Sequence, residues 1–373
     1  MSILSKFSKT VVAASIACSF TAYGMVAEAA TTIRVQSVIS AKADEVVMLK
    51  EFAKDVFDLT DGEVIIKVLP AGAVVGVKET LDAVDKGLVE GGFAWTHYWS
   101  GKHPAAMLFG SPVAGAGVGI DNIAFLSWFQ YGGGKELYDQ LWVEMGMNIK
   151  GFMLQPVGPE ALGWFKEPIA SMEDFKKYRF RTPPGIPGQT YKDIGIASVS
   201  MGGADILPAL EKGTIDAAEW CCPKPDSVFG FQKVLKHYYL QGLHQVVVNA
   251  DLYINGDVYK SLTPLQQKAL EVAANASLSK SMSYRIYENG KALKDLTENH
   301  GVILHDTPAD YFPAYMNAAK ASLEKNAAEN PFFAKVWQSQ KDFAAIAVPF
   351  WAGSQASNAA LGKAFADSVK KAK

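Results

Sequence analysis

Two alternating apolar segments with an amphipathic segment between them decide the fold class of this chain. The first reads Thr32-Ile33-Arg34-Val35-Gln36-Ser37-Val38, and the last reads Glu63-Val64-Ile65-Ile66-Lys67-Val68-Leu69. Alternation of this kind is typical of β-strands, whereas residues 44–59 between them carry apolar side chains at helical spacing. A strand, a crossover helix and a second strand are the parts of a parallel α/β unit. The sequence therefore predicts an α/β fold.

A second pattern occurs twice, 126 residues apart. Residues 81–90 read Leu-Asp-Ala-Val-Asp-Lys-Gly-Leu-Val-Glu, and residues 207–216 read Leu-Pro-Ala-Leu-Glu-Lys-Gly-Thr-Ile-Asp. Each is typical of a helix that ends in Lys-Gly, with the glycine in a left-handed conformation, before the chain enters a strand. Such a junction is also common in unrelated α/β proteins. Because single cores stop growing near about 250–300 residues, the repeat in a chain of 373 residues indicates two lobes.

The last third of the chain has long helical patterns. Thr263-Pro264 is a typical helix start, and apolar residues then recur about every four positions until Gly301. A helix of about 35 residues is longer than one lobe needs, so we expect it to span both lobes or to contact a partner subunit. Residues 309–373 are Ala-rich with helical spacing, and we assign 331–373 to a C-terminal helical tail.

The first residues have the order of a secretory signal peptide. Lys6 and Lys9 precede the apolar run 11–20, and Ala27-Glu28-Ala29 has the form of a cleavage site. We therefore predict a signal peptide at 1–29 and a periplasmic location. A lipid-anchored form is the alternative, because Ser15-Ile16-Ala17-Cys18 loosely resembles a lipoprotein box without its usual leading Leu.

The charge of the remaining chain excludes one class of partner. Removing Lys6, Lys9 and Glu28 with the signal leaves 34 basic and 37 acidic side chains, a net charge of −3. A strongly basic nucleic-acid binder is therefore excluded, and we expect no nucleic-acid partner. No later segment has the run of about 18 uncharged apolar residues that a membrane span requires.

Catalytic motifs are absent from the sequence: it has no H-E-x-x-H, C-x-x-C, G-x-S-x-G or Walker A pattern. We expect the scattered histidines to be packed or surface residues; they are His97, His103, His237, His244, His300 and His305. Cys221 and Cys222 are adjacent, and neighbouring Cα atoms lie about 3.8 Å apart, closer than the usual disulfide span. They form either a strained vicinal disulfide or two thiols.

Two segments carry candidate binding residues. Tyr178-Arg179-Phe180-Arg181-Thr182-Pro183-Pro184 alternates as a strand and ends in a turn, which puts Arg181 at the carboxyl end, where ligands bind in α/β sheets. Its guanidinium is suited to clamp a carboxylate, although a surface salt bridge is the alternative. Asp216-Ala217-Ala218-Glu219-Trp220 is again a strand end, with an oxygen ligand and a stacking ring. Glu160 is a carboxylate just before a strand, and a cation site with Glu219 requires the fold to bring the two together.

These segments together resemble the solute receptors of TRAP (tripartite ATP-independent periplasmic) transporters. The resemblance also rests on Trp95-Thr96-His97-Tyr98-Trp99 with Gly101-Lys102, and on Lys236-His237-Tyr238-Tyr239 with Gly242-Leu243-His244. It covers the chain from about residue 32 to past residue 300 and is closest to the branch that binds 2-oxo acids with a metal. It implies two α/β lobes joined by crossing hinge strands, with a long helix spanning both. Lobe I would comprise 31–155 and 246–330, and lobe II 156–245.

The resemblance also implies a role for individual residues. Arg181 would fix the ligand carboxylate, Tyr98 would hydrogen-bond the ligand, and Trp220 and Trp95 would line the pocket. Glu219 and the Trp220 carbonyl would bind the metal, sodium or calcium, together with Glu160 and Gln245. In the oxo-acid branch a Gln commonly stands where Glu160 is, and an acidic residue where Gln245 is. The exchange leaves the formal charge of the site unchanged.

The sequence thus predicts a non-enzymatic receptor. It would capture a 2-oxo or 2-hydroxy monocarboxylate such as pyruvate or lactate and deliver it to a TRAP membrane permease. One alternative is a larger sugar acid or aromatic acid as ligand. The other is a secreted hydrolase that uses Glu160, Asp216 and Glu219 as acid and base. The resemblance also implies a homodimer through the C-terminal helices as a candidate assembly.

Overall fold

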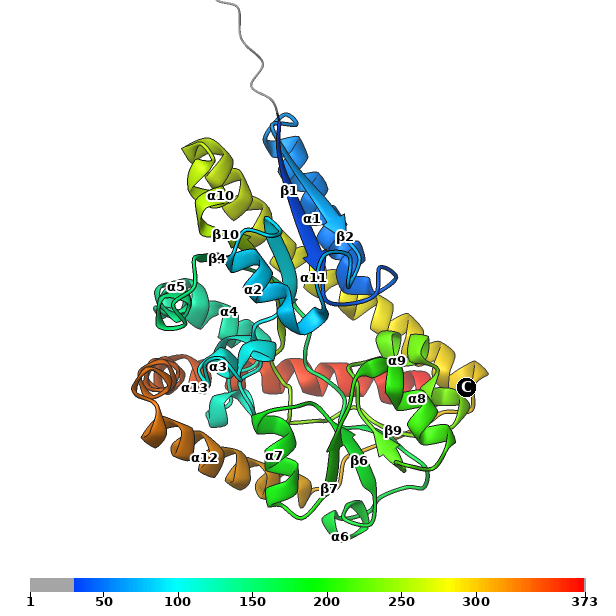
Figure 1. The fold of residues 1–373 in the computed structure, drawn as a ribbon. Coiled ribbons are helices and arrows are strands. Elements are labelled where there is room, and N and C mark those ends of the chain that lie inside the picture. The colour runs from blue at the N-terminus through cyan, green and yellow to red at the C-terminus, as the bar shows by residue number, and fades with distance from the viewer. Residues whose placement is uncertain (1–29, 372–373) are drawn as a thin grey trace, which may run out of the picture.

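The computed structural model describes residues 30–371, whose strands form two sheets, one in each of two lobes (Figure 1). The first sheet has the strand order β2 (Val64–Leu69), β1 (Thr31–Ser37), β3 (Gly91–Trp95), β10 (Asn249–Asn255), β4 (Ile149–Pro156). The second has the order β11 (Ile303–His305), β9 (His237–Tyr239), β5 (Gly163–Phe165), β8 (Ala217–Ala218), β6 (Arg179–Thr182), β7 (Ala197–Ser200). The predicted two-lobed α/β fold is confirmed. The predicted signal peptide, with Cys18, lies outside the described residues.

The first α/β unit forms as the alternation predicts. Strands β1 and β2 pair in parallel, and α1 (Asp44–Leu59) makes the crossover with the predicted bounds. Leu49, Phe52 and Val56 on this helix are buried, because their spacing puts them on one face against the sheet.

The Lys-Gly repeat marks corresponding places in the two lobes. Helix α2 (Thr80–Asp85) leads through Gly87 into β3, and α8 (Gly203–Glu211) leads through Gly213 into β8. Both glycines have positive φ, +69° and +66°, as a left-handed helix terminus requires. The residues that follow β3 and β8 therefore occupy equivalent strand ends.

In each sheet, the first strand after the chain crosses from the other lobe is antiparallel to its neighbours. β5 follows β4 after residues 157–162 and is antiparallel to β8 and β9. β10 follows β9 after residues 240–248 and is antiparallel to β3 and β4. The two crossing segments pair with each other, since Val157 N–H donates to Val248 O at 2.7 Å and Glu160 N–H to Gln245 O at 3.0 Å. Glu160 and Gln245 thus lie between the lobes.

The long helix α11 (Pro264–Asn299) runs from beside α10 (Gly256–Ser261) in the first lobe to α9 (Pro223–Phe229) in the second (Figure 1). Thr263 and Gln266 cap its start with reciprocal hydrogen bonds. At 1.5 Å per residue it is about 54 Å long, so the helix ends in the second lobe and the chain continues there. For this reason β11 joins the second sheet, and the prediction that all of 246–330 belongs to lobe I is wrong for this strand.

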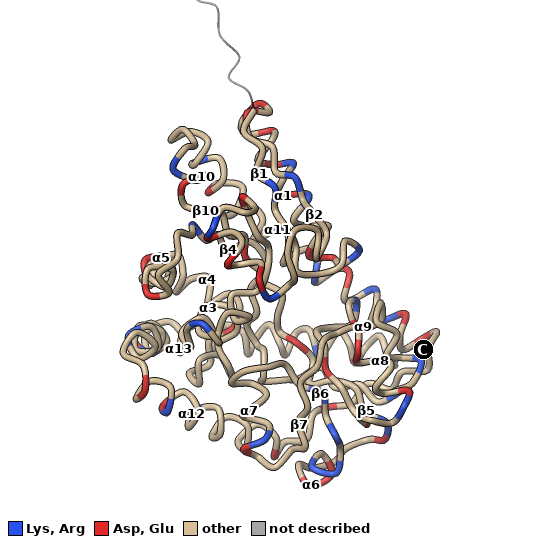
Figure 2. Tube along the Cα trace, viewed as in Figure 1, with Lys and Arg blue, Asp and Glu red and all other residues tan. Residues whose placement is uncertain are grey.

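The remaining helices cover the sheets and carry the chain to its end. They include α3 (Ala106–Gly110), α4 (Asn122–Tyr131), α5 (Gly134–Glu144), α6 (Met172–Phe175) and α7 (Ile186–Asp193), with 3₁₀ turns η1 (Val77–Glu79), η2 (Thr96–Trp99), η3 (Gly115–Gly117) and η4 (Phe231–Lys233). Helix α12 (Tyr311–Glu329) packs on α7, and α13 (Pro331–Lys371) packs on α3, α4, α5 and α12. Figure 2 shows basic and acidic residues interspersed over both lobes. Within residues 30–371, no helix combines the length and apolarity needed to cross a membrane.

A buried ion pair ties α1 to α11. Arg285 Nη2 lies 2.5 Å from Glu45 Oε1, and both side chains are less than a tenth exposed. Glu45→Ala should lower the free energy of unfolding by about 3–5 kcal/mol, because it leaves the guanidinium charge buried without its partner. Urea denaturation measures this change. Asp58→Ala on the same helix, which breaks an exposed pair with Lys54, should have a far smaller effect. Equal effects of the two substitutions would contradict the assignment.

Candidate functional site

Two arginines on β6 face different surroundings. Arg179 at the start of the strand is exposed and pairs with Asp216 at 2.7 Å. Arg181 at the carboxyl end is only 5% exposed, and its Nη1 lies 2.5 Å from Glu219 Oε1. β6 and β8 run in parallel, and Arg181 lies beside Ala218. Asp216, just before β8, therefore lies next to Arg179, and Glu219, just after β8, lies next to Arg181. Asp216 is thus held at the outer end of the strand by Arg179.

The Arg181 guanidinium is also held by backbone. Its Nε and Nη2 donate to Met201 O at 3.2 and 3.0 Å, and Nη1 donates to Glu219 O at 3.1 Å. The Trp220 ring lies 5.0 Å from the guanidinium carbon, a cation–π distance. Arg181 thus lies at the carboxyl end of its strand, as predicted, and the structure shows in addition that it is buried there.

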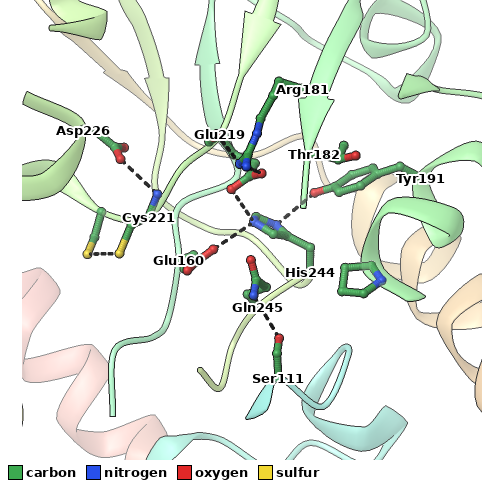
Figure 3. Close-up of polar contacts among 12 residues, drawn as sticks. Ser111, Glu160, Arg181, Thr182, Tyr191, Glu219, Cys221, Asp226, His244 and Gln245 are labelled. Atoms are coloured by element: carbon green, nitrogen blue, oxygen red, sulfur yellow. Dashed lines mark hydrogen bonds and ion pairs between the residues drawn. The ribbon is translucent and has the colours of Figure 1, made fainter. Parts of the chain in front are cut away.

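Three buried side chains converge beside this arginine: Glu219 after β8, and Glu160 and His244 from the crossing segments (Figure 3). His244 Nε2 lies 3.6 Å from Glu219 Oε2 and 3.7 Å from Glu160 Oε2. These three atoms are buried and have no hydrogen-bond partner in the structure. One ligand atom from each residue lies within 4.8 Å of the others, so the arrangement has the size and donors of a cation site.

Burial and neighbouring charges shift the pKa values of the three groups in this cluster, and the two carboxyl groups shift in opposite directions. Burial raises the pKa of Glu160 to about 7, with nearby Glu219 adding to the shift and His244 opposing it. Burial also acts to raise the pKa of Glu219, but Arg181 and His244 outweigh it and hold that pKa below its usual value. Burial acts to lower the pKa of His244, yet the two carboxylates raise it to about 9. The buried carboxylates are therefore stabilised by the positive charges of Arg181 and His244.

His244 was not predicted as a site residue, since the histidines show no metal-ligand spacing along the chain. Its Nδ1 lies 3.0 Å from the Tyr191 hydroxyl, which lies 3.2 Å from the Tyr311 hydroxyl. These contacts orient the ring so that Nε2 faces the carboxylates. Two sequence signals pointed to it: its place in the Gly242-Leu243-His244 motif and its position next to Gln245.

The other predicted residues lie nearby with different orientations. Gln245 is 4% exposed and donates from Nε2 to Ser111 Oγ at 3.1 Å, so its amide binds the first lobe rather than the carboxylates (Figure 3).

Trp95 ends β3, and its ring lies 5.2 Å from that of Tyr98 in η2. Burial raises the pKa of the Tyr98 phenol to about 12, against the opposing effect of the Arg181 charge, although 37% of the residue surface is exposed. Trp220 is half-buried.

Comparisons with known proteins place the chain among solute-binding proteins. A family model described as bacterial extracellular solute-binding protein, family 7 (DctP), matches residues 36–330. A monocarboxylate 2-oxoacid-binding periplasmic protein from Nostoc sp. is 30% identical over 292 residues, which are 78% of this chain and 78% of that protein.

Two solved structures share the fold over most of the chain. A TRAP transporter solute-binding protein from Bordetella bronchiseptica, a dimer with copurified calcium and picolinate, matches with a TM-score of 0.83 and 27% identity, over 93% of this chain and 100% of that one. One from Pseudoalteromonas atlantica with bound sodium and pyruvate matches with a TM-score of 0.79 and 28% identity, over 89% and 99%. Given the family match over residues 36–330, this chain belongs to the DctP family of TRAP solute-binding proteins.

Proposed function

We propose that this protein captures a 2-oxo or 2-hydroxy monocarboxylate, such as pyruvate or lactate, with a bound cation and delivers it to a TRAP membrane permease. The family consists of extracellular receptors for solutes. The observation that carries the finer proposal is that buried Arg181 lies beside three ligand atoms of Glu160, Glu219 and His244, none of which has a hydrogen-bond partner among the described residues. The proposal is supported by the pyruvate-bound relative and by the 2-oxoacid-binding relative.

Arg181 would bind the ligand carboxylate. A guanidinium donates two parallel hydrogen bonds to a carboxylate, which fixes the orientation of the acid. In the structure Glu219 Oε1 accepts a hydrogen bond from one of these donors, Arg181 Nη1. An arriving carboxylate competes for that donor, so Glu219 then needs another positive partner.

A sodium or calcium ion would be that partner. Glu219, the Trp220 carbonyl, Glu160 and Gln245 are the proposed ligands, with His244 Nε2 facing the same point. For Gln245 to join them, its amide must leave Ser111. A hard cation accepts carboxylate and carbonyl oxygens, including a 2-oxo or 2-hydroxy oxygen of the ligand. Trp95, Tyr98 and Trp220 would exclude water, which strengthens both interactions.

A larger ligand is the alternative within the same function. The three aromatic side chains Trp95, Tyr98 and Trp220 also suit an aromatic acid, and the Bordetella relative holds picolinate with calcium. Competition between picolinate, sugar acids and pyruvate distinguishes these ligands.

The hydrolase alternative is favoured by one observation, the opposite pKa shifts of Glu160 and Glu219, which resemble those of an acid and base pair. Against it, Asp216 is held by Arg179 at the outer end of β8, and His244 lies against both carboxylates. Turnover of model glycosides would favour the hydrolase; binding of unaltered pyruvate would favour the receptor.

The C-terminal helix supports a homodimer. Its last part exposes large apolar side chains: Ile346, Phe350, Leu361 and Phe365 are each more than 70% exposed. We propose that a second copy of this chain covers this part of α13, as the dimeric Bordetella relative suggests.

Arg181→Lys should raise the dissociation constant for pyruvate about thirtyfold or more. It keeps the charge but loses the bidentate fork, and a hydrogen bond to a charged group contributes about 1.5–3 kcal/mol. Isothermal titration calorimetry measures the affinity, and the melting temperature reports the fold. Arg179→Lys on the same strand is the matched control and should bind normally. Wild-type affinity in a folded Arg181→Lys protein would remove this arginine from the mechanism.

Chelator treatment should weaken pyruvate binding, and calcium or sodium should restore it. Glu219→Gln should abolish this response, because a carboxylate ligand is lost, whereas exposed Glu211→Gln should not. Titration with and without each cation measures the effect. Glu160→Gln should also weaken the response, and adding Gln245→Glu should recover it, since the pair then regains its formal charge. Binding that ignores cations in every variant would refute the cation site.

Leu361→Lys with Phe365→Lys should convert a dimer to a monomer, because charges would replace the apolar contact. Size-exclusion chromatography with light scattering measures the mass. Lys363→Ala, on the opposite side of the helix, should leave the dimer intact. A wild-type protein that is monomeric at all concentrations would exclude the assembly.

A further inference from the structure

Two adjacent thiols lie beside the site and take no part in the proposed binding. The Cys221 and Cys222 sulfurs are 2.9 Å apart, and each residue is 5% exposed (Figure 3). We propose that Cys221 and Cys222 are a redox-active pair that closes to a vicinal disulfide and thereby weakens ligand binding. The effect on binding rests on the proposed function, whereas the formation of the disulfide does not.

The reaction needs a two-electron acceptor, for which we name a disulfide. One Cys thiolate attacks the acceptor and displaces one of its sulfurs as a thiol, giving a mixed disulfide. The neighbouring thiolate then forms the Cys221–Cys222 bond and releases the second sulfur. Two S–H bonds and the acceptor S–S bond are lost; one S–S bond and two acceptor thiols are formed. Disulfides persist outside the cytoplasm, where this extracellular family acts.

Closing the ring must change the local backbone. Adjacent Cα atoms across a trans peptide lie about 3.8 Å apart, whereas disulfides usually span about 4.4 Å or more. Cys222 is also extended, with φ −155° and ψ 172°, where it caps α9. The peptide unit between the two residues must therefore turn. A disulfide formed with this strain is easily reduced, which is typical of regulatory rather than structural disulfides.

That peptide unit is connected to the binding site. Cys221 O accepts a hydrogen bond from Ala161 N–H at 2.7 Å, and Ala161 follows Glu160 directly. Cys221 N–H donates to Asp226 Oδ1 at 3.0 Å. Because Glu219 lies two residues before Cys221, turning the carbonyl disturbs both carboxylates of the cluster.

The pair is also connected to the first lobe. Arg285 Nη1 lies 3.9 Å from Cys222 Sγ, and Arg285 Nη2 binds Glu45 on α1. Movement of Cys222 therefore changes the surroundings of the ion pair between α1 and α11.

The test oxidises the purified secreted protein with diamide, whose N=N bond accepts the two hydrogens. The tryptic peptide 213–233 contains both cysteines, and we expect it to become two hydrogen atoms lighter and to stop reacting with iodoacetamide. The oxidised protein should melt at a lower temperature, since the Ala161 hydrogen bond is disturbed and so short a loop contributes little entropy. The dissociation constant for pyruvate should rise about tenfold or more, and reductant should reverse each change.

Cys221→Ser and Cys222→Ser keep the backbone bonds and are the controls. Each should bind pyruvate like the reduced protein and ignore diamide. Thiols that stay free, or disulfides only between molecules, would refute the pair; an intramolecular disulfide with unchanged affinity would refute its effect on binding. If the reduced protein binds none of the acids, the proposed function fails, while peptide mass and melting temperature still decide whether the pair is redox-active.

Discussion

The buried contact between Arg181 and Glu219 is the interaction on which the site depends. Taking two charges out of water is costly unless each keeps a partner. Here each group binds the other, and Arg181 also donates from Nε, Nη1 and Nη2 to backbone oxygens. His244 compensates the other oxygen of Glu219 and also faces Glu160. A carboxylate ligand that takes Arg181 leaves Glu219 short of positive charge. In the proposed mechanism, acid and cation therefore bind together.

The fold brings these charged groups together because the chain crosses between the lobes twice at the same place. Glu160 and His244 lie on the two crossing segments, which are in backbone contact. Gly158 shows how close they are, because a Cβ atom there would lie 2.9 Å from Val246 O and 3.0 Å from Gln245 O. Closely paired crossing segments are suited to act as a common hinge of the kind that periplasmic binding proteins use.

The residues around the site come from both lobes and from the crossing segments. Arg181 and Glu219 belong to the second lobe, whereas Tyr98 and Ser111 belong to the first, and Gln245 joins the crossing segment to Ser111. In the proposed mechanism, closure of the lobes would bring Trp95 and Tyr98 of the first lobe to the charged strand ends of the second. Arg285 contacts both Cys222 and Glu45, so the proposed change at the thiol pair would reach α1 as well as the carboxylates.

Sequence periodicity by itself determined the α/β class, the helix at 44–59, the long helix from Pro264 and the paired Lys-Gly junctions, because these depend on local spacing. It also placed Arg181 and Glu219 at strand ends, since alternation and turn residues are local signals. It did not separate buried Arg181 from exposed Arg179, which required the register of β6 with β8.

Only the tertiary structure brought His244 to Glu160 and Glu219, residues 84 and 25 positions away along the chain, and turned Gln245 toward Ser111. It also placed β11 in the second sheet. The physical reason is the same in each case: no local pattern encodes a contact between distant segments, and such contacts are set by how the crossing segments and α11 connect the lobes.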